Sequence, residues 1–553
     1  MQRDTVKRFY LIHSWIGALT AILMFVIAFT GAVSVFGRPE IKIWAHEELH
    51  RPIAIPHASL EARLRNVMAE VPAGYRDDIQ ILMPGVRRSP YLSFLFQRDD
   101  ENADGSTYRD VIRLDNDPQT LELVERRQGE QRELLDTERK DLADFLITFH
   151  ADLHLDDPIG LMITGLLGLT LFASVVTGVI THRKILREAF TFRPFRSLRL
   201  LFTDTHKVLG VWGLLFHSVI AFTGAFLGLA VVILLPAAAF VSFEGDLDRM
   251  VETYLPVDAP AKSGVHANLE IAGVLDAAAS ADRGEIVTVQ LLGGEDREAV
   301  ALVYTLAGEG IIGETQRYRV SDAALLETYT QFSRVGGAAG VLLDTMFPLH
   351  FGNFGGLFVK FLWFFLGLGT AFLALSGAMI WIERRAYGPI GQLSSTAYHN
   401  ISRLVLGSCA GVVLATTVLF HLQLLVLPRV SETGPWLMGT FFGVWLIAIV
   451  WAQLQAKVYQ AARLLLGAAG VSACLVPAVS AITGHGGLVA IGNSAFSVAM
   501  GTELVLICLG LALLYVSLRL PSERPAEKTA IDETSQEPPT VAAMPAPVEG
   551  AVR

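Results

Sequence analysis

The feature that most constrains this chain is an internal repeat in which a long apolar segment begins with a histidine. Residues 13–32 read HSWIGALTAILMFVIAFTGA, and residues 206–225 read HKVLGVWGLLFHSVIAFTGA. The hexapeptide IAFTGA is identical in both stretches, and histidine, glycine and Thr-Gly recur at the same positions. Self-similarity at a constant offset predicts that the chain contains two copies of one structural unit.

The apolar composition indicates a membrane protein. Of 553 residues, 52% are hydrophobic and 18% are charged, which is too apolar for an ordinary soluble domain. Eight apolar runs are long enough to cross a bilayer as helices. These runs cover approximately residues 11–36, 159–182, 207–236, 357–382, 402–427, 436–454, 461–483 and 495–518. We therefore predict a polytopic α-helical membrane protein of about eight spans.

The links between these runs differ in charge. Lysine and arginine gather before the first span, between the second and third, and after the fourth, sixth and eighth. The positive-inside rule then predicts that both termini are cytoplasmic. Residues 37–158 and 237–356 fall outside, and their alternation of apolar and polar residues predicts two small α+β domains. Residues 397–519 form an additional four-span region, and the Pro- and Glu-rich tail at 520–553 is predicted to be disordered.

The second and fourth spans also resemble each other. Leu-Gly-Leu occurs at 167–169 and at 366–368, and Thr177-Gly178 is matched by Ser376-Gly377. The repeated unit is therefore a pair of helices, and the first four spans are two copies of it. We predict that they form a four-helix bundle made of residues 1–36, 159–236 and 357–390.

Histidines stand near the ends of these four spans. His13 and His206 begin the first and third spans, while His150, His154 and His350 precede the second and fourth. In a bundle of alternating direction, His13 and His206 meet at the cytoplasmic end, and His150 or His154 can meet His350 at the outer end. Two imidazoles that face each other in a bundle core form an axial pair for haem iron. A single histidine at a membrane interface more often anchors a helix, so the prediction depends on the joint pattern.

Three further residues fit a haem site near His206. Gly17 and Gly210 follow His13 and His206 by four residues, so each shares the helix face of its histidine. Without a side chain there, a porphyrin can lie close to the helix. His217 follows His206 by three turns, which places it about 16 Å deeper on a straight helix. It is a candidate ligand of a second or third haem.

Four motifs together resemble the PepSY-associated transmembrane family, which includes iron-regulated inner-membrane proteins and haem-containing ferric-siderophore reductases. They are HSWIG at 13–17, FHADLH at 149–154, DTHKVLGVW at 204–212, and PLHFGNFGG at 348–356 with WIERR at 381–385. The resemblance covers residues 1–390. It implies b-type haems in a bacterial inner membrane, with iron ligands His13, His150 or His154, His206 and His350, and electron delivery to a periplasmic ferric chelate.

The leading functional hypothesis is therefore electron transfer through two haems, or three, to ferric iron held by a siderophore. No flavin or nicotinamide motif is present, so the expected donor is quinol or a separate reductase. No nucleic-acid partner is expected. Two alternatives remain: a transporter that uses the histidines as a relay for protons or metal ions, and a non-catalytic assembly or sensor protein.

Overall fold

The structure is a computed structural model of the chain. The structure describes residues 3–521, apart from short segments at 47–54, 85–89, 102–106, 137–139, 183–189, 191–192, 194–197, 255–258, 282–283, 306–313, 388–391, 486 and 491–496. Nearly all of the predicted disordered tail (residues 522–553), and most of the basic link between the second and third spans, lie outside the described residues.

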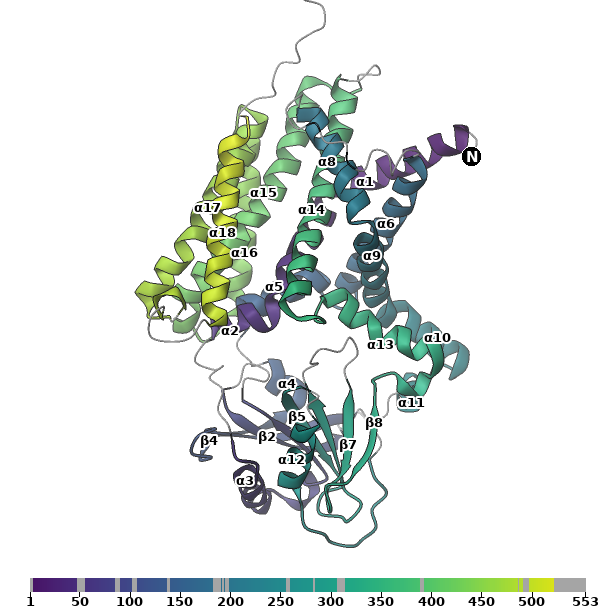
Figure 1. The fold of residues 1–553 in the computed structure, drawn as a ribbon, viewed down its shortest axis with the longest axis vertical. Helices are drawn as coiled ribbons and strands as arrows, with labels where there is room; N and C mark the ends of the chain where they lie inside the picture. Colours follow the sequence, from purple (N-terminus) through teal and green to yellow (C-terminus); the bar gives the residue numbers. More distant parts are fainter. Residues whose placement is uncertain are drawn as a thin grey trace, which may run out of the picture.

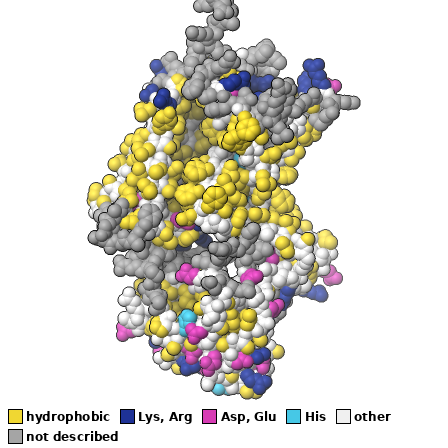
Figure 2. Space-filling view, viewed as in Figure 1, with side chains coloured by type: hydrophobic (Ala, Val, Ile, Leu, Met, Phe, Trp, Pro, Cys, Tyr) yellow, Lys and Arg dark blue, Asp and Glu magenta, His cyan; other side chains and the backbone are white. Residues whose placement is uncertain are grey.

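Long apolar helices dominate the part of the chain that the structure describes. Seven have the length and composition of membrane spans, and a bent pair of helices supplies an eighth. The seven are α1 (Arg3–Ser34), α6 (Ile159–Thr181), α14 (Gly356–Tyr387), α15 (Ser395–Leu425), α16 (Gly434–Leu454), α17 (Val458–Thr483) and α18 (Val498–Arg519). Figure 2 shows apolar side chains over the surface of this helical part, as expected where lipid is the solvent. The chain is a polytopic α-helical membrane protein.

The third span is broken. It consists of α8 (Leu198–Trp212) and α9 (Leu214–Leu229), which meet at Gly213 with a bend of 74°. The first copy of the repeat has Thr20 at the matching position, and α1 continues straight through it as one helix. A glycine costs helix stability but tolerates unusual backbone geometry. The two copies of the repeat therefore differ in shape at this point.

The first four spans pack as one bundle (Figure 1). Helix α1 packs against α14 and α6, α6 packs against α9, and α8 packs against α14. Small residues allow the close approaches between α6 and α9. A Cβ atom added at Gly168 would lie 2.5 Å from the backbone nitrogen of Ala225, and one at Gly165 would lie 2.9 Å from the carbonyl carbon of Gly228. This is the small-residue packing by which membrane helices associate.

The last four spans form a second group beside α14. Helix α15 packs against α14, α16 and α17, and α17 packs against α18. In the most apolar stretch of α15, 72% of the residues are buried inside the protein. The corresponding share is 17% to 33% for the other six long helices. Helix α15 is therefore the core of this group and joins it to the histidine-containing bundle.

A β-sheet domain lies at one end of the helices (Figure 1). The sequence predicts two outer α+β domains, whereas the structure joins the two segments in a single eight-stranded antiparallel sheet of order β4-β3-β2-β1-β5-β6-β7-β8. The strands are β1 (Asp78–Leu82), β2 (Leu92–Glu101), β3 (Thr107–Asn116), β4 (Leu123–Glu130), β5 (Ile286–Leu292), β6 (Val300–Thr305), β7 (Thr315–Arg319) and β8 (Leu325–Tyr329). The join is the pairing of β1 with β5, centred on Gln80 opposite Gln290.

The sheet repeats the internal duplication of the bundle. Each half is a helix followed by a four-strand meander, and these helices are α3 (His57–Glu70) and α12 (Ile271–Ser280). Both helices contribute to one hydrophobic core with the central strands, through side chains such as Leu64, Phe94, Val274 and Val289. One shared core explains why the two halves fold together: each strand meander alone would leave an apolar face and an inner edge open.

Two short helices carry the chain from the sheet back toward the bundle. They are α5 (Leu142–Asp152) and α13 (Gly337–Phe351). Helix α5 packs against α1 and α6, and α13 packs against α9. Each ends at a residue of left-handed conformation, Leu153 and Gly352, just before the following span. We call this end of the bundle the sheet side and the opposite end the far side.

Candidate functional site

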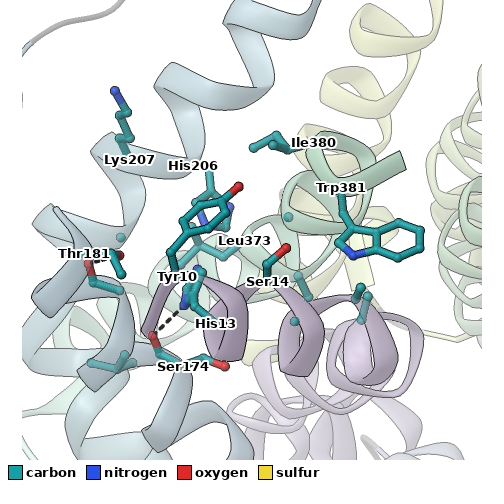
Figure 3. Close-up of a pocket in the computed structure, with 18 of the residues that line it drawn as sticks. Tyr10, His13, Ser14, Ser174, Thr181, His206, Lys207, Leu373, Ile380 and Trp381 are labelled. Carbon is teal, nitrogen blue, oxygen red and sulfur yellow. Dashed lines mark hydrogen bonds between the residues drawn. The ribbon is translucent and has the colours of Figure 1, made fainter. Parts of the chain in front are cut away.

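His13 on α1 and His206 on α8 meet at the far side of the bundle (Figure 3); we call them the far-side pair. Their ring centres are 6.3 Å apart, and the ring planes cross at 80°. The Nδ1 atom of His13 donates to the backbone carbonyl of Ser174 at 3.0 Å, and Nδ1 of His206 bonds the hydroxyl of Ser376 at 3.0 Å. Neither histidine lies at a helix start, because α1 and α8 begin at Arg3 and Leu198.

His150 and His350 meet at the sheet side; we call them the sheet-side pair. Their ring centres are 6.0 Å apart, and the ring planes differ by 26°. Both residues stand near the ends of the short helices α5 and α13, not on the spans that follow. Nδ1 of His150 donates to the carbonyl of Ile27 at 2.9 Å, and Nδ1 of His350 bonds the hydroxyl of Thr223 at 3.0 Å.

These hydrogen bonds assign the same tautomer to all four histidines. A carbonyl oxygen can only accept, so Nδ1 of His13 and of His150 carries the proton. The hydroxyls of Ser376 and Thr223 donate to the carbonyls of Leu373 and Val219, so they accept from the histidines. Each ring therefore has Nδ1–H fixed by another helix and a lone pair on Nε2. Histidines that bind metals are usually held in this way.

A glycine lies beneath each of the four imidazoles. A Cβ atom added at Gly178 or Gly377 would lie 3.4 or 3.3 Å from Cε1 of His13 or His206. At the sheet side, a Cβ atom added at Gly31 would lie 2.6 Å from Cε1 of His150, and one added at Gly224 would lie 3.2 Å from Cε1 of His350. Each imidazole thus packs against a glycine of a neighbouring helix.

These glycines belong to a motif whose role the sequence analysis missed. Each follows a serine or threonine, at 30–31, 177–178, 223–224 and 376–377, and all four hydroxyl residues are at most 5% exposed. Three of the hydroxyls lie within 3.3 Å of a paired histidine. Thr-Gly alone is common in membrane helices. Each of the first four spans contains such a Ser/Thr-Gly pair, and this regular recurrence could have identified the motif from the sequence.

The far-side pair borders a cavity of about 1000 Å³. Its walls come from α1, α6, α8, α9 and α14, and they include Gly17, Gly210 and His217. An added Cβ atom would meet nothing within 4 Å at Gly17, and at Gly210 only Leu373, at 3.8 Å. Both glycines therefore face open space, as a planar cofactor beside them would require. The volume is at the upper end of the range for small-molecule and cofactor sites.

His217 is not placed as the repeat predicts. Because the helix bends at Gly213, His217 does not continue the face of His206, although it lines the same cavity. Its Nε2 donates to the carbonyl of Leu209 at 3.2 Å, and its Nδ1 bonds the hydroxyl of Thr370 at 3.0 Å. One ring nitrogen thus bonds across the bend to α8 and the other bonds to α14, which suits a residue that stabilises the break.

His154 turns away from the sheet-side pair. Its Nε2 donates to the carbonyl of Phe145 at 3.0 Å, and its ring centre lies 4.4 Å from that of Phe145. Of the two alternatives that the sequence left open, the structure brings His150 to His350. His421 in α15 is a single intramembrane histidine, and its Nε2 bonds the carbonyl of Ser472 at 2.9 Å.

The separation of the two rings in each pair fits one iron held between two imidazoles. With metal–nitrogen bonds of about 2.0–2.1 Å, as in zinc–histidine sites, the two ring centres would lie about 6 Å apart. No group of three or more His, Cys, Asp or Glu able to hold a bare ion occurs among the described residues. Two protein ligands are enough for an iron ion whose remaining coordination positions are occupied by a porphyrin. The donor set, the fixed tautomers and the far-side cavity therefore agree with a haem.

Comparison with known proteins places this arrangement in a family. The profile described as "PepSY-associated TM region" matches residues 10–384, which include both histidine pairs. An uncharacterised protein of Pseudomonas aeruginosa is 30% identical over 354 residues, which are 61% of this chain and 86% of that protein. The family match ends at residue 384, before α15 begins, so the last four spans lie beyond it. The chain belongs to the PepSY-associated transmembrane family.

Proposed function

We propose that the protein is a b-haem electron-transfer protein of the bacterial inner membrane that reduces a periplasmic acceptor. The proposed acceptor is ferric iron bound by a siderophore. Siderophores with hard oxygen ligands bind Fe(III) tightly, and one-electron reduction to Fe(II) weakens this binding and releases the iron. In this proposal the sheet domain is periplasmic and the far side of the bundle is cytoplasmic. The donor is a quinol or a separate reductase.

One observation supports the proposal above the others: two pairs of histidines stand at opposite ends of one bundle, each with ring centres about 6 Å apart. On α1, His13 belongs to the far-side pair, and the carbonyl of Ile27 holds His150 of the sheet-side pair. These positions are 14 residues apart, about 21 Å along a helix. In this proposal, one pair therefore lies toward each leaflet.

The residues of the chain would set the properties of the two sites. When bound, haem would supply one-electron chemistry at potentials tuned by ligands, burial and hydrogen bonds. His13, His206, His150 and His350 would hold the irons. The acceptors of their Nδ1 protons increase the basicity of the imidazoles and fix the ring orientations.

A reduction assay tests this function. The purified protein is reduced anaerobically with dithionite, excess reductant is removed, and a ferric hydroxamate or catecholate siderophore is added in a stopped-flow spectrometer. We expect the haem bands to change to their oxidised form while Fe(II) appears in stoichiometric amount, trapped by a ferrous chelator. Reduced haem bands that persist in the presence of every ferric chelate would contradict the proposed acceptor.

A further inference from the structure

The far-side cavity has chemically different ends. Toward the sheet it is closed by apolar side chains such as Met24 and Leu214, together with Thr370 and His217. At its other end the wall contains three cations: Lys207, Arg384 and Arg385. No Asp or Glu is among the cavity-lining residues that the structure describes. The cavity thus offers an apolar environment at one edge and positive charge at the other.

Two of these cations stand on helices that pack against each other. Lys207 is on α8, directly after His206, and Arg384 is on α14, with its guanidinium 5.2 Å from the ring centre of Tyr10. Arg385 is engaged differently, because its guanidinium stacks on the rings of Trp15 and Trp381 at 4.8 and 4.0 Å.

One acidic residue lies near this end of the cavity. Asp204 is one turn before Lys207, is 1% exposed and pairs with Arg193 at 2.9 Å. It does not line the cavity. Asp204 also interacts electrostatically with Lys207. The cavity edge is still lined by three cations and by no carboxylate among the described residues, so an anionic group is the complementary ligand.

We propose that Lys207 and Arg384 bind the two carboxylates of a haem held by His13 and His206. This inference rests on the proposed function, and it assigns an orientation: the carboxylate edge of the macrocycle faces the far side and its apolar edge faces Met24 and Leu214. The opposite orientation would bury two carboxylates against apolar side chains inside the membrane, which is strongly unfavourable. The orientation also places the charged edge of the cofactor at the end of the bundle where a cytoplasmic donor would arrive.

The same cations could instead attract the carboxylate or phosphate of a soluble donor, so the test must separate the two sources. The experiment uses the His350→Ala protein, in which only the far-side haem is expected to remain. Into it we introduce the pair Lys207→Gln and Arg384→Gln. Lys207→Arg is the charge-conserving variant, and Arg519→Gln at the end of α18, where Arg519 stacks on Tyr515 at 5.3 Å, is the control. Haem potential is measured by spectroelectrochemistry with no donor present.

Two cations beside a haem favour its reduced form, which carries less positive charge. We therefore expect the Gln pair to shift the one-electron equilibrium toward the oxidised form by about tenfold, or 59 mV. The same variant should release haem faster to apomyoglobin. Lys207→Arg combined with unchanged Arg384, and Arg519→Gln, should retain the parent potential.

Two results would have different meanings. If the Gln pair keeps the parent potential and haem retention but is reduced more slowly by an anionic donor, the cations serve the donor and the proposed orientation is overturned. If the wild-type protein contains no haem at all, the proposed function itself fails, and this inference fails with it.

Discussion

The two histidine pairs come from the same repeat, but the chain surrounds them differently. At the far side, a Cβ atom added at either glycine beneath the rings would lie 3.3 to 3.4 Å from Cε1 of the imidazole, and a cavity of about 1000 Å³ lies beside the pair. At the sheet side the distance is 3.2 Å at Gly224 but only 2.6 Å at Gly31, and both histidines come from short helices next to the β-sheet. The comparison teaches that the far-side pair borders an open cavity, whereas the sheet-side pair contains the most tightly packed imidazole of the four, that of His150.

Removing a ligand should have the largest effect and should separate the two pairs. His206→Ala and His350→Ala should each remove roughly one haem equivalent, because an iron that loses one of two axial ligands is held weakly. Haem content is measured by the pyridine haemochrome assay per mole of chain. His421→Ala is the matched control, since His421 is also an intramembrane histidine but bonds the carbonyl of Ser472. Loss of both haems from either ligand variant would contradict two independent sites.

The glycines should show the difference in packing most clearly. Gly31→Ala places a methyl group 2.6 Å from Cε1 of His150, so the imidazole must move, and overpacking of this kind typically costs about 1–3 kcal/mol. Gly178→Ala meets His13 at 3.4 Å, an ordinary contact. We expect Gly31→Ala to lose most of the sheet-side haem and Gly178→Ala to keep both haems. Equal loss in the two variants would remove the distinction between the pairs.

Removing a hydroxyl partner should have a smaller effect on haem retention, and only where that hydroxyl bonds a paired histidine. Thr223→Val removes the acceptor of the His350 Nδ1 proton, and loss of such a partner typically lowers metal affinity by about 10–100-fold. Thr30→Val should change haem retention little, because His150 donates to the carbonyl of Ile27 and Thr30 bonds its own helix. Haem transfer to apomyoglobin measures both variants. A faster loss from Thr30→Val than from Thr223→Val would contradict the assigned hydrogen bonds.

The smallest effect is expected from a charge in the sheet domain, remote from both pairs. Backbone amides of Glu298, Ser263 and Gly264, with the Ser263 hydroxyl, lower the pKa of Asp296 to about 2. A folded-state pKa below the unfolded value of 3.8 means that Asp296 stabilises the sheet above about pH 4 and stops doing so as the pH falls toward 2.

Asp296→Asn should therefore weaken the sheet slightly at pH 7 and make its unfolding less dependent on pH between 4 and 2. Circular dichroism during acid titration measures this, and haem absorbance at neutral pH should be unchanged. A change in the far-side haem would show that the sheet and the far-side pair are coupled.

The sequence predicted the spans and the meeting of the histidines because both depend on local composition and on the direction of helices. Apolar runs mark spans, and alternating direction brings His13 to His206. The repeat also predicted a straight third span, and this was wrong at Gly213, since an internal match cannot show that Thr20 in one copy and Gly213 in the other behave differently.

Other features depend on contacts between distant parts of the chain. The pairing of β1 with β5 joins segments about 200 residues apart, and strand alternation alone does not say which edges meet. The choice of His150 over His154 depends on the left-handed turn at Leu153, which carries His154 toward Phe145. The Ser/Thr-Gly motif was visible in the sequence, but its role appears only when a histidine from another helix lies on it.

The central claim is that each pair of imidazoles holds one haem iron, and the most direct measurement is the haem count and spin state of the purified wild-type protein. Pyridine haemochrome analysis gives the number of b haems per chain, and electron paramagnetic resonance of the oxidised protein gives their ligation. The account predicts two haems per chain, both low-spin with two imidazole ligands. A colourless protein, or haem in a high-spin state with a single histidine ligand, would contradict it.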